Sequence, residues 1–478
     1  MGGQQTPAEP GETCTAEPAD ALASRFPLGF VWGAATAAYQ IEGSTGADGR
    51  GPSIWDTFSH APGRTYMGDT GDIGCDHYAR LDSDLDLIQA LNLGAYRFSV
   101  AWPRVQPAGH GAANAAGVDF YDRLVNGLLQ RGIDPWLTLY HWDLPQPLED
   151  RGGWPEREIV GRFAEYARIV VDRLGDRVRH WITLNEPWVF TMVGYGDGRH
   201  APGRRDWPAA LLAGHHAHLA HREAAAAIHA GAAGAEVGIA LNLAPVEPAT
   251  EAAGDVKAAR LHDGALNRWW LDPIFGRGYP LDMIAAYGPL LRGVDVRELE
   301  GAAPPLDFLG VNYYSRARMA APSRDRAPAG PLPILAAPPV LPITAMGWEV
   351  EPAGLRRLLG RLTREYAPAA LAITENGAAY VDVVAPDGSV VDTDRLRYLR
   401  DHVAAAADAM DDGAPLVAYF AWSLLDNFEW AEGYAKRFGI VHVDYPTQRR
   451  TVKASGRWYA ALAKAARSDS ADGAPGSP

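Results

Sequence analysis

The chain has 478 residues, of which 47% are hydrophobic, and it carries a formal net charge of −14 at pH 7. The hydrophobic content is ample for a large globular core, whereas the acidic balance argues against nucleic acid and anionic membranes as partners, since both attract basic surfaces. No apolar stretch approaches the roughly 18 residues of a transmembrane helix, and no secretory signal is evident. We therefore expect a cytoplasmic protein that acts on a neutral small molecule.

The two ends differ in composition from the body of the chain. Residues 1–24 are rich in Gly, Pro, Glu and Thr without an apolar period, and residues 467–478 are rich in Ser, Asp and Gly. Both are therefore expected to be disordered tails. Between them no linker is long enough to separate two domains, and the nearest candidate, 320–342, is typical of a long loop. The sequence thus predicts one domain over residues 25–466.

Eight short apolar runs recur along the body, separated by stretches rich in Ala, Leu and Arg such as 163–174 and 211–228. The runs lie at 30–36, 95–102, 135–141, 181–185, 237–243, 308–314, 371–374 and 416–422. Strands that are apolar throughout are typical of parallel sheets covered on both faces. Eight alternations over this length predict a single-domain α/β fold, a (β/α)8 TIM barrel. The alternative is a doubly wound sheet. Such a sheet is expected to have a glycine-rich phosphate-binding turn after an early strand, and none is present.

Two of these runs end on a glutamate. The segment Trp-Ile-Thr-Leu-Asn-Glu-Pro places Glu186 before Pro187, and Leu-Ala-Ile-Thr-Glu-Asn-Gly places Glu375 shortly before Gly377. A carboxylate at the end of a buried strand destabilises the fold unless it is paired with another group or has a function. Each glutamate could be a structural ion-pair partner. Two of them are also what glycoside hydrolysis needs, one to donate a proton and one to attack or to activate water.

Polar and aromatic side chains occur at most of the other strand ends as well. In a (β/α)8 barrel the carboxyl ends of the strands form the active-site face. The residues at or soon after the expected strand ends are Gln40, Arg97, His141, Asn185, Asn312, Tyr314, Trp422 and Glu429. Their recurrence at nearly every strand is hard to explain by core packing, so they are candidates for a shared site.

Seven segments of the chain resemble those of glycoside hydrolase family 1 β-glucosidases. In chain order they are FVWGAATAAYQIEG (30–43), YRFSVAWPR (96–104), YHWDLPQ (140–146), TLNEP (183–187), NYY (312–314), TENG (374–377) and WSLLDNFEW (422–430). A lone Asn-Glu-Pro would be weak evidence, whereas seven matches in order on the expected strand ends are specific. The resemblance extends from about residue 25 to about residue 465.

The resemblance implies an enzyme that hydrolyses terminal, non-reducing β-D-glucosyl residues of small glycosides and oligosaccharides, with side activity on β-galactosides and β-fucosides. Glu186 matches the family's acid/base and Glu375 its nucleophile. The family is retaining, which implies carboxyl groups about 5–5.5 Å apart. Arg97 matches the cation that keeps the nucleophile ionised, and Tyr314 matches the phenol that hydrogen-bonds to it.

Other matches imply a binding site for the terminal sugar. Asn185 corresponds to the amide that holds the 2-hydroxyl, Trp422 to the platform beneath the sugar, and Phe438 to the residue that lines its 6-position. Trp188 and Trp348 fall where the family meets the leaving group. The further positions expected to contact the sugar are Gln40, His141, Trp142, Asn312, Glu429 and Trp430.

Particular residues argue against two branches of the family. The plant thioglucosidase branch lacks the acid glutamate, which is present here as Glu186. The 6-phospho branch carries Ser and Lys in the region of Glu429 and Trp430, and a carboxylate there is expected to repel phosphate. Two alternatives stay open: a catalytically silent carbohydrate-binding barrel, which fold alone does not exclude, and a transglycosylase that uses the same residues.

A histidine cluster stands out in the helical stretch at 211–228. Its members are His215, His216, His218 and His221. The spacing is that of neighbours on a helix, but the His-Glu-x-x-His arrangement of a zinc site is missing. A helix face is therefore expected, and the sequence implies neither a metal nor another cofactor.

Two smaller features have modest interpretations. Asp82, Asp84 and Asp86 alternate near a helix start, where negative charge is favourable, and predict a solvated surface. The two cysteines, Cys14 and Cys75, form no disulfide framework. Cys75 is expected to be a small buried residue.

Overall fold

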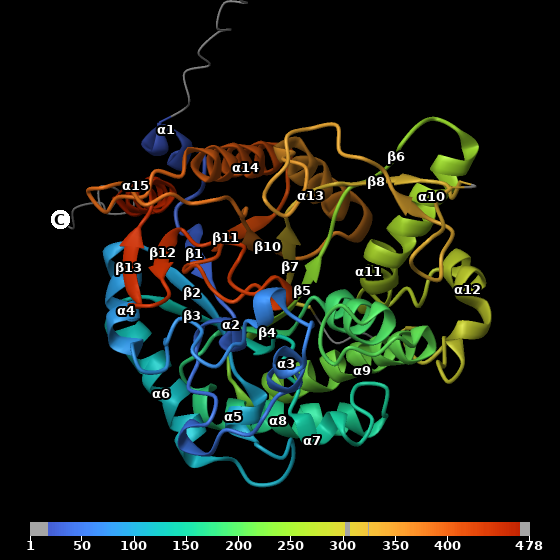
Figure 1. Ribbon diagram of the computed structural model, residues 1–478, viewed down its shortest axis with the longest axis horizontal. Coiled ribbons are helices and arrows are strands. Elements are labelled where there is room, and N and C mark those ends of the chain that lie inside the picture. Colours follow the sequence, from blue (N-terminus) through green and yellow to red (C-terminus); the bar gives the residue numbers. More distant parts are fainter. Residues whose placement is uncertain (1–17, 302–305, 324, 469–478) are drawn as a thin grey trace, which may run out of the picture.

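The computed structural model describes residues 18–301, 306–323 and 325–468, so the expected tail segments 1–17 and 469–478 lie outside it. Eight parallel strands close into a barrel (Figure 1). In order around the barrel they are β1 (Val31–Ala35), β2 (Ala95–Ser99), β3 (Asp134–Tyr140), β4 (His180–Asn185), β5 (Glu236–Asn242), β7 (Phe308–Tyr313), β10 (Leu371–Asn376) and β11 (Leu416–Trp422), which pairs back to β1. The (β/α)8 prediction is confirmed, and every barrel strand overlaps the run expected for it.

Helices surround the barrel (Figure 1). The longer ones are α4 (Leu81–Ala90), α6 (Ala115–Gln130), α8 (Glu158–Leu174), α9 (Trp207–Gly231), α10 (Ala253–Asp263), α13 (Pro352–Tyr366), α14 (Thr393–Asp411) and α15 (Ala454–Ser468). In α13 the buried residues Leu355, Leu358, Leu359 and Leu362 recur every three or four positions and so form one apolar face. No helix within the described ranges is long and apolar enough to cross a bilayer.

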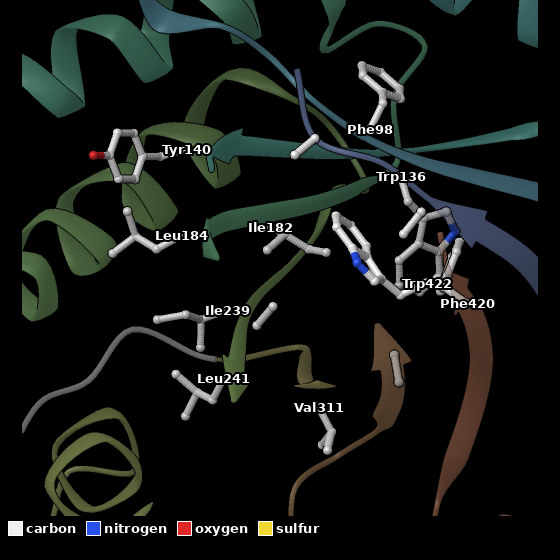
Figure 2. Close-up of a cluster of buried hydrophobic side chains, with 14 of the residues drawn as sticks. Phe98, Trp136, Tyr140, Ile182, Leu184, Ile239, Leu241, Val311, Phe420 and Trp422 are labelled. Carbon is white, nitrogen blue, oxygen red and sulfur yellow. The ribbon is translucent and has the colours of Figure 1, made fainter. Parts of the chain in front are cut away.

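Large side chains fill the interior of the barrel near the amino ends of its strands. The ring of Trp136 on β3 packs against that of Phe420 on β11 (Figure 2), at 5.0 Å. It lies 5.2 Å from the ring of Phe308 on β7. Side chains from strands that are not neighbours therefore meet inside the barrel. Gly33 on β1 makes room for them, because a β-carbon there would lie 2.5 Å from the Phe420 ring. This packing closes the barrel beneath the face formed by the carboxyl ends of the strands.

Two small sheets lie outside the barrel. Their strands are β6 (Val246–Pro248), β8 (Ala317–Ala320) and β9 (Leu335–Ala336) in one, and β12 (Val441–Asp444) and β13 (Arg449–Val452) in the other. The segment 320–342, expected as a long loop, contributes β9 to the first sheet. Part of the same segment, around Ala336 and Pro339, lines the large cavity of the molecule.

The N-terminal boundary expected at residue 25 is wrong. Residues Ala19–Ala23 form a short helix, α1, whose Leu22 is fully buried, and α1 packs beside α15 (Figure 1). Arg25 is tied to Asp408 on α14 by an ion pair of 2.7 Å. At the other end, α15 continues through residue 468, past the expected start of the tail. The ion pair alone joins residues 383 positions apart, which no local pattern announces.

Candidate active site

A cavity of about 910 Å³ opens at the carboxyl ends of the barrel strands. Most of the site residues expected from the sequence line it: His141, Trp142, Glu186, Trp188, Asn312, Tyr314, Trp348, Glu375, Trp422, Glu429, Trp430 and Phe438. The other three, Gln40, Arg97 and Asn185, are buried behind the lining and hydrogen-bond to it. The structure therefore brings all of these residues together.

Glu375, on β10, is held by two donors. Nη1 of Arg97 on β2 donates to Oε1 at 2.8 Å, and the phenol of Tyr314 donates to Oε2 at 2.5 Å. Burial raises the pKa of Glu375, while the Arg97 cation and the Tyr314 hydrogen bond oppose that shift. Both donors stabilise the ionised carboxylate, which is the form that can attack an electrophilic carbon.

Glu186 directly follows β4, where the backbone enters the left-handed region with φ of 46°. Its Oε1 accepts a hydrogen bond of 2.7 Å from Nδ2 of Asn312. Burial, together with the nearby charge of Glu375, raises the pKa of Glu186 to about 8. The cation Arg97 contacts Glu375, whereas the donor to Glu186 is a neutral amide. A proton shared by the two carboxyl groups therefore resides on Glu186 at neutral pH.

Arg97, Asn185 and Asn312 belong to one network that joins four barrel strands. Nη2 of Arg97 donates to Oδ1 of Asn185 at 2.6 Å, and Nδ2 of Asn312 donates to the same oxygen at 3.0 Å. Oδ1 of Asn312 in turn accepts from the hydroxyl of Thr374 at 2.7 Å. Because each amide meets donors on its oxygen, the orientation of both amides is determined.

The orientation of Asn185 also determines the tautomer of His141. Nδ2 of Asn185 lies 3.0 Å from Nε2 of His141. An amide nitrogen only donates, so Nε2 is the acceptor and the ring proton is on Nδ1. Burial, and then the charge of Arg97, lowers the pKa of His141 well below its ordinary value, so the ring is neutral. Its buried Nδ1 has no partner within the described part of the chain, which leaves a donor for a ligand.

Trp142 and Trp430 form an aromatic wall. Both have positive φ, 77° and 51°, and their rings lie 4.4 Å apart. The indole N–H of Trp142 donates to the carbonyl of Asn185 at 2.8 Å. A ligand therefore meets the ring of Trp142 rather than a free N–H group.

Gln40 and Glu429 form a polar corner of the site. Nε2 of Gln40 donates to the carbonyl of Phe428 at 2.7 Å, while its buried Oε1 has no partner among the residues described. Burial, and then the charge of Glu375, raises the pKa of Glu429 to about 8. The raised pKa reduces the negative charge that Glu429 carries at neutral pH, so the repulsive charge expected at this position is smaller than the sequence suggested.

Aromatic side chains continue from the closed end of the cavity to its mouth. The ring of Trp422, at the end of β11, stacks 5.7 Å from that of His141. Phe438 lies 6.0 Å from Tyr314 and 6.1 Å from Trp348. Trp422 and Phe438 are buried, whereas Trp348 is half-buried. An elongated ligand would therefore meet aromatic side chains from Trp422 at the closed end outward to Trp348.

Other lining residues were not identified from the sequence. His200 lies in the cavity wall with its ring 5.4 Å from that of Trp55, and burial lowers its pKa to about 3. Arg64, Arg205 and Arg318 also line the cavity, and the first two are exposed. These side chains come from long connections rather than from strand ends, and no motif examined in the sequence pointed to them.

The four histidines of α9 are buried and have separate partners. No group of three or more side chains that could hold a metal ion occurs in the described ranges. The contacts are Glu298 and Tyr279 for His215, the Trp154 carbonyl for His216, the Trp270 ring for His218, and the Thr183 hydroxyl for His221. The histidines thus tie α9 to its surroundings.

One of the expected surface acids is buried instead. Asp84 is 1% exposed, accepts a hydrogen bond of 2.9 Å from Nε of Arg450, and lies 2.8 Å from Nδ1 of His77. The prediction of a solvated acidic patch was therefore wrong for Asp84. Its partner Arg450 lies 366 residues further along the chain, so the sequence around Asp84 gives no sign of the pair. Cys75 is buried, as expected, and its thiol donates to the carbonyl of Asp426.

The chain is similar to known proteins over most of its length. The model of glycosyl hydrolase family 1 matches residues 22–468. The chain is 48% identical over 444 residues to β-glucosidase A of Thermotoga maritima, covering 92% of this chain and 98% of that protein. It is 44% identical over 456 residues to a bifunctional β-D-glucosidase/β-D-fucosidase of Bifidobacterium breve, covering 91% and 97%.

The fold of the chain is also similar to that of solved structures. The solved structure of β-glucosidase from Thermotoga maritima in complex with glucoimidazole matches with a TM-score of 0.87 at 47% identity, over 92% of this chain and 99% of that chain. The family match covers nearly the whole described body, including both glutamates. The chain belongs to glycosyl hydrolase family 1.

Proposed function

We propose that the protein is a retaining β-glucosidase that removes terminal glucose from the non-reducing end of small β-glycosides. The observation that carries the proposal is the pair Glu186 and Glu375 in one cavity. The ionised form of Glu375 is stabilised by hydrogen bonds from Arg97 and Tyr314, and the pKa of Glu186 is raised to about 8. Two carboxyls with separated proton affinities are what double displacement requires.

In the first step a carboxylate oxygen of Glu375 attacks the anomeric carbon. The bond to the leaving oxygen breaks, and that oxygen takes the proton of Glu186. The products are a glycosyl ester on Glu375 and a free alcohol. In the second step Glu186, now ionised, takes a proton from water while the water oxygen attacks the same carbon. The ester bond breaks, Glu375 returns to a carboxylate, and the sugar leaves with its original configuration.

Unused polar atoms support the binding of a sugar ring at the closed end. The amide nitrogen of Asn185 has two hydrogens and spends one on His141, so the other can reach the 2-hydroxyl. Nδ1–H of His141 and Oε1 of Gln40 are a donor and an acceptor that lack partners in the described ranges. Sugar hydroxyls would satisfy both, and burying such atoms unsatisfied would be costly. Glu429, which also lines the cavity, would contact hydroxyls beside Gln40.

The aromatic residues have complementary parts in this proposal. Trp422 would lie beneath the sugar ring, and Phe438 would line its 6-position. Trp188 and Trp348, both half-buried, would contact the leaving group. Side activity on β-fucosides is proposed too, since the Bifidobacterium relative is named for both activities, and we extend it to β-galactosides.

The test is a panel of p-nitrophenyl β-glycosides of glucose, galactose and fucose, with the first-formed product followed by NMR. We expect colour release from the glucoside and a sugar that is initially β. An initial α-sugar would contradict the retaining mechanism. No release from any member of the panel would favour a silent carbohydrate-binding barrel.

A further inference from the structure

The lining of the cavity is rich in arginine although the chain as a whole is acidic. The net charge of the chain is −14, and the catalytic end of the cavity holds the carboxyls Glu186, Glu375 and Glu429. The lining nevertheless includes five arginines, namely Arg64, Arg199, Arg205, Arg316 and Arg318. In a chain that is acidic overall, an arginine-rich lining indicates a binding site for a ligand.

Two of these arginines are neutralised by the protein itself. Nε of Arg316 lies 2.8 Å from Oε2 of Glu349, and Nη1 lies 2.9 Å from Oε2 of Glu247. Arg199 pairs with Asp197 at 2.8 Å. Their charges are therefore compensated before any ligand arrives.

The other three arginines have no carboxylate within ion-pair distance in the described ranges. The guanidinium of Arg64 lies 5.3 Å from the centre of the Phe58 ring. Arg318 donates to two backbone carbonyls, at 3.0 and 3.1 Å. Arg205 is exposed. These three arginines thus line the cavity without an ion-pair partner among the described residues, and Glu432, which also lines it, lies 4.0 Å from Lys436.

Arg64 and Arg205 lie on the same part of the wall. A β-carbon on Gly203 would lie 3.4 Å from Nη1 of Arg64, and Gly203 precedes Arg205 by two residues. Both arginines are exposed, whereas the residues proposed to hold the sugar are buried at the closed end. A leaving group attached to that sugar would extend outward, and the exposed Arg64 and Arg205 line the same cavity as Trp188.

We infer that the preferred substrates are β-glucosides whose leaving group is an aromatic carboxylic acid linked through its phenolic oxygen. The aromatic ring would pack against Trp188 and Trp348, and the carboxylate would face Arg64 and Arg205. A guanidinium matches a carboxylate in shape and charge, and arginine stacks on aromatic faces. This inference rests on the proposed glucosidase function and adds the class of the leaving group.

The test compares kcat/KM for 4-carboxyphenyl and 4-carbamoylphenyl β-D-glucoside, which differ in charge but little in shape. Exposed ion pairs are weak and screened by salt. We expect the carboxylate-to-amide quotient to fall about threefold to tenfold between low salt and roughly 0.5 M NaCl. The double variant Arg64→Gln/Arg205→Gln should lower the low-salt quotient by a similar factor. Dividing the variant's quotient by that of the wild type cancels the different acidities of the two phenols.

Two further variants separate charge from other effects. Arg64→Lys/Arg205→Lys keeps both charges and should retain most of the quotient. Arg292→Gln removes an exposed arginine that does not line the cavity, and it should leave the quotient unchanged. If both glucosides are hydrolysed but the quotient does not respond to salt or to the Gln variant, the inference is overturned and the glucosidase function stands. If neither glucoside is hydrolysed, both fail.

Discussion

The phenol of Tyr314 donates a hydrogen bond of 2.5 Å to Oε2 of Glu375, across the boundary between two neighbouring barrel strands. The bond stabilises the ionised carboxylate and opposes the upward effect of burial on the pKa of Glu375. Because Glu375 must be ionised to attack, the same bond sets how far into acid the enzyme can work.

Tyr314→Phe should therefore raise the pKa of Glu375 and move the acidic limb of kcat/KM to higher pH. A hydrogen bond to a charged group is worth about 1.5–3 kcal/mol, which corresponds to about 1–2 pH units. The matched control is Tyr313→Phe. It removes the buried phenol of the neighbouring residue, the last of β7, which donates to the carbonyl of Glu351 instead. The control should lower stability without moving the limb. An acidic limb that stays in place in Tyr314→Phe would contradict the contact's proposed effect.

The raised pKa of Glu186 predicts the alkaline limb. Burial and the charge of Glu375 raise that pKa to about 8, and a general acid acts only while protonated. The rate should be full below this pKa and fall as the pH rises through about 8. The profile of kcat/KM measures it, since that quantity reports the free enzyme. With a 2,4-dinitrophenyl glucoside, whose leaving group needs no proton, kcat/KM should fall much less as the pH rises through about 8. Equal limbs for both substrates would exclude Glu186 as the acid.

Much of the barrel and its site could be predicted because the relevant signals are local. Each strand is a short apolar run, and both glutamates and several other expected site residues lie at or soon after strand ends, so closing the barrel brings them together. Glu186 and Glu375 are 189 positions apart in sequence, yet both lie at carboxyl ends of strands. Knowing the architecture was therefore enough to predict that they share a cavity.

The predictions that failed depend instead on contacts between residues far apart in the sequence. Helix α1 was missed because Leu22 is buried by α15, at the far end of the chain. Asp84 was expected in solvent because its partner Arg450 lies on β13. Whether Arg64 and Arg205 have ion-pair partners depends on which carboxylates the folded chain brings near them. Such properties belong to the three-dimensional neighbourhood, and no spacing in the sequence encodes them.

The neighbourhood of Glu429 predicts rejection of 6-phosphorylated glucosides. The charged groups that act on Glu429 are other carboxyls, Glu375 and Glu432, and its hydrogen-bond partner Gln40 is neutral. A buried phosphate at this position would lack a cationic partner, at a cost of about 3–5 kcal/mol. We expect kcat/KM for p-nitrophenyl β-glucoside to exceed that for its 6-phosphate by about 10²-fold or more. Glu429→Gln should narrow the ratio, and a preference for the phosphate would refute the argument.

A buried ion-pair network predicts where the fold is sensitive. Lys453 is fully buried and its Nζ lies between Asp382 and Asp426, with the contact to Asp426 at 2.6 Å. Lys453→Met would leave both carboxylates with less compensation, and removing one partner of a buried pair costs about 3–5 kcal/mol. The midpoint of urea unfolding should fall accordingly, whereas the exposed Lys257→Met should change little. A loss below about 1 kcal/mol would mean that water or repacking compensates the carboxylates.

Substitution of each glutamate in turn separates their roles. General acid catalysis is worth about 10²–10⁴-fold, and only where the leaving group needs a proton. Glu186→Ala should therefore slow cellobiose hydrolysis far more than formation of the glycosyl-enzyme from a dinitrophenyl glucoside. Glu375→Ala removes the attacking atom, so even the activated substrate should fail.

Added azide gives the two variants opposite products. In Glu186→Ala the glycosyl-enzyme still forms, but no base activates water to release it. Azide needs no base, so it should restore turnover and, after two displacements, yield a β-glycosyl azide. In Glu375→Ala azide can occupy the space left by the carboxylate and attack the substrate directly, and one displacement gives the α-azide. NMR of the two azides decides the assignment. The reverse pattern would exchange the roles of Glu186 and Glu375, and undiminished activity in both variants would place the chemistry outside this cavity.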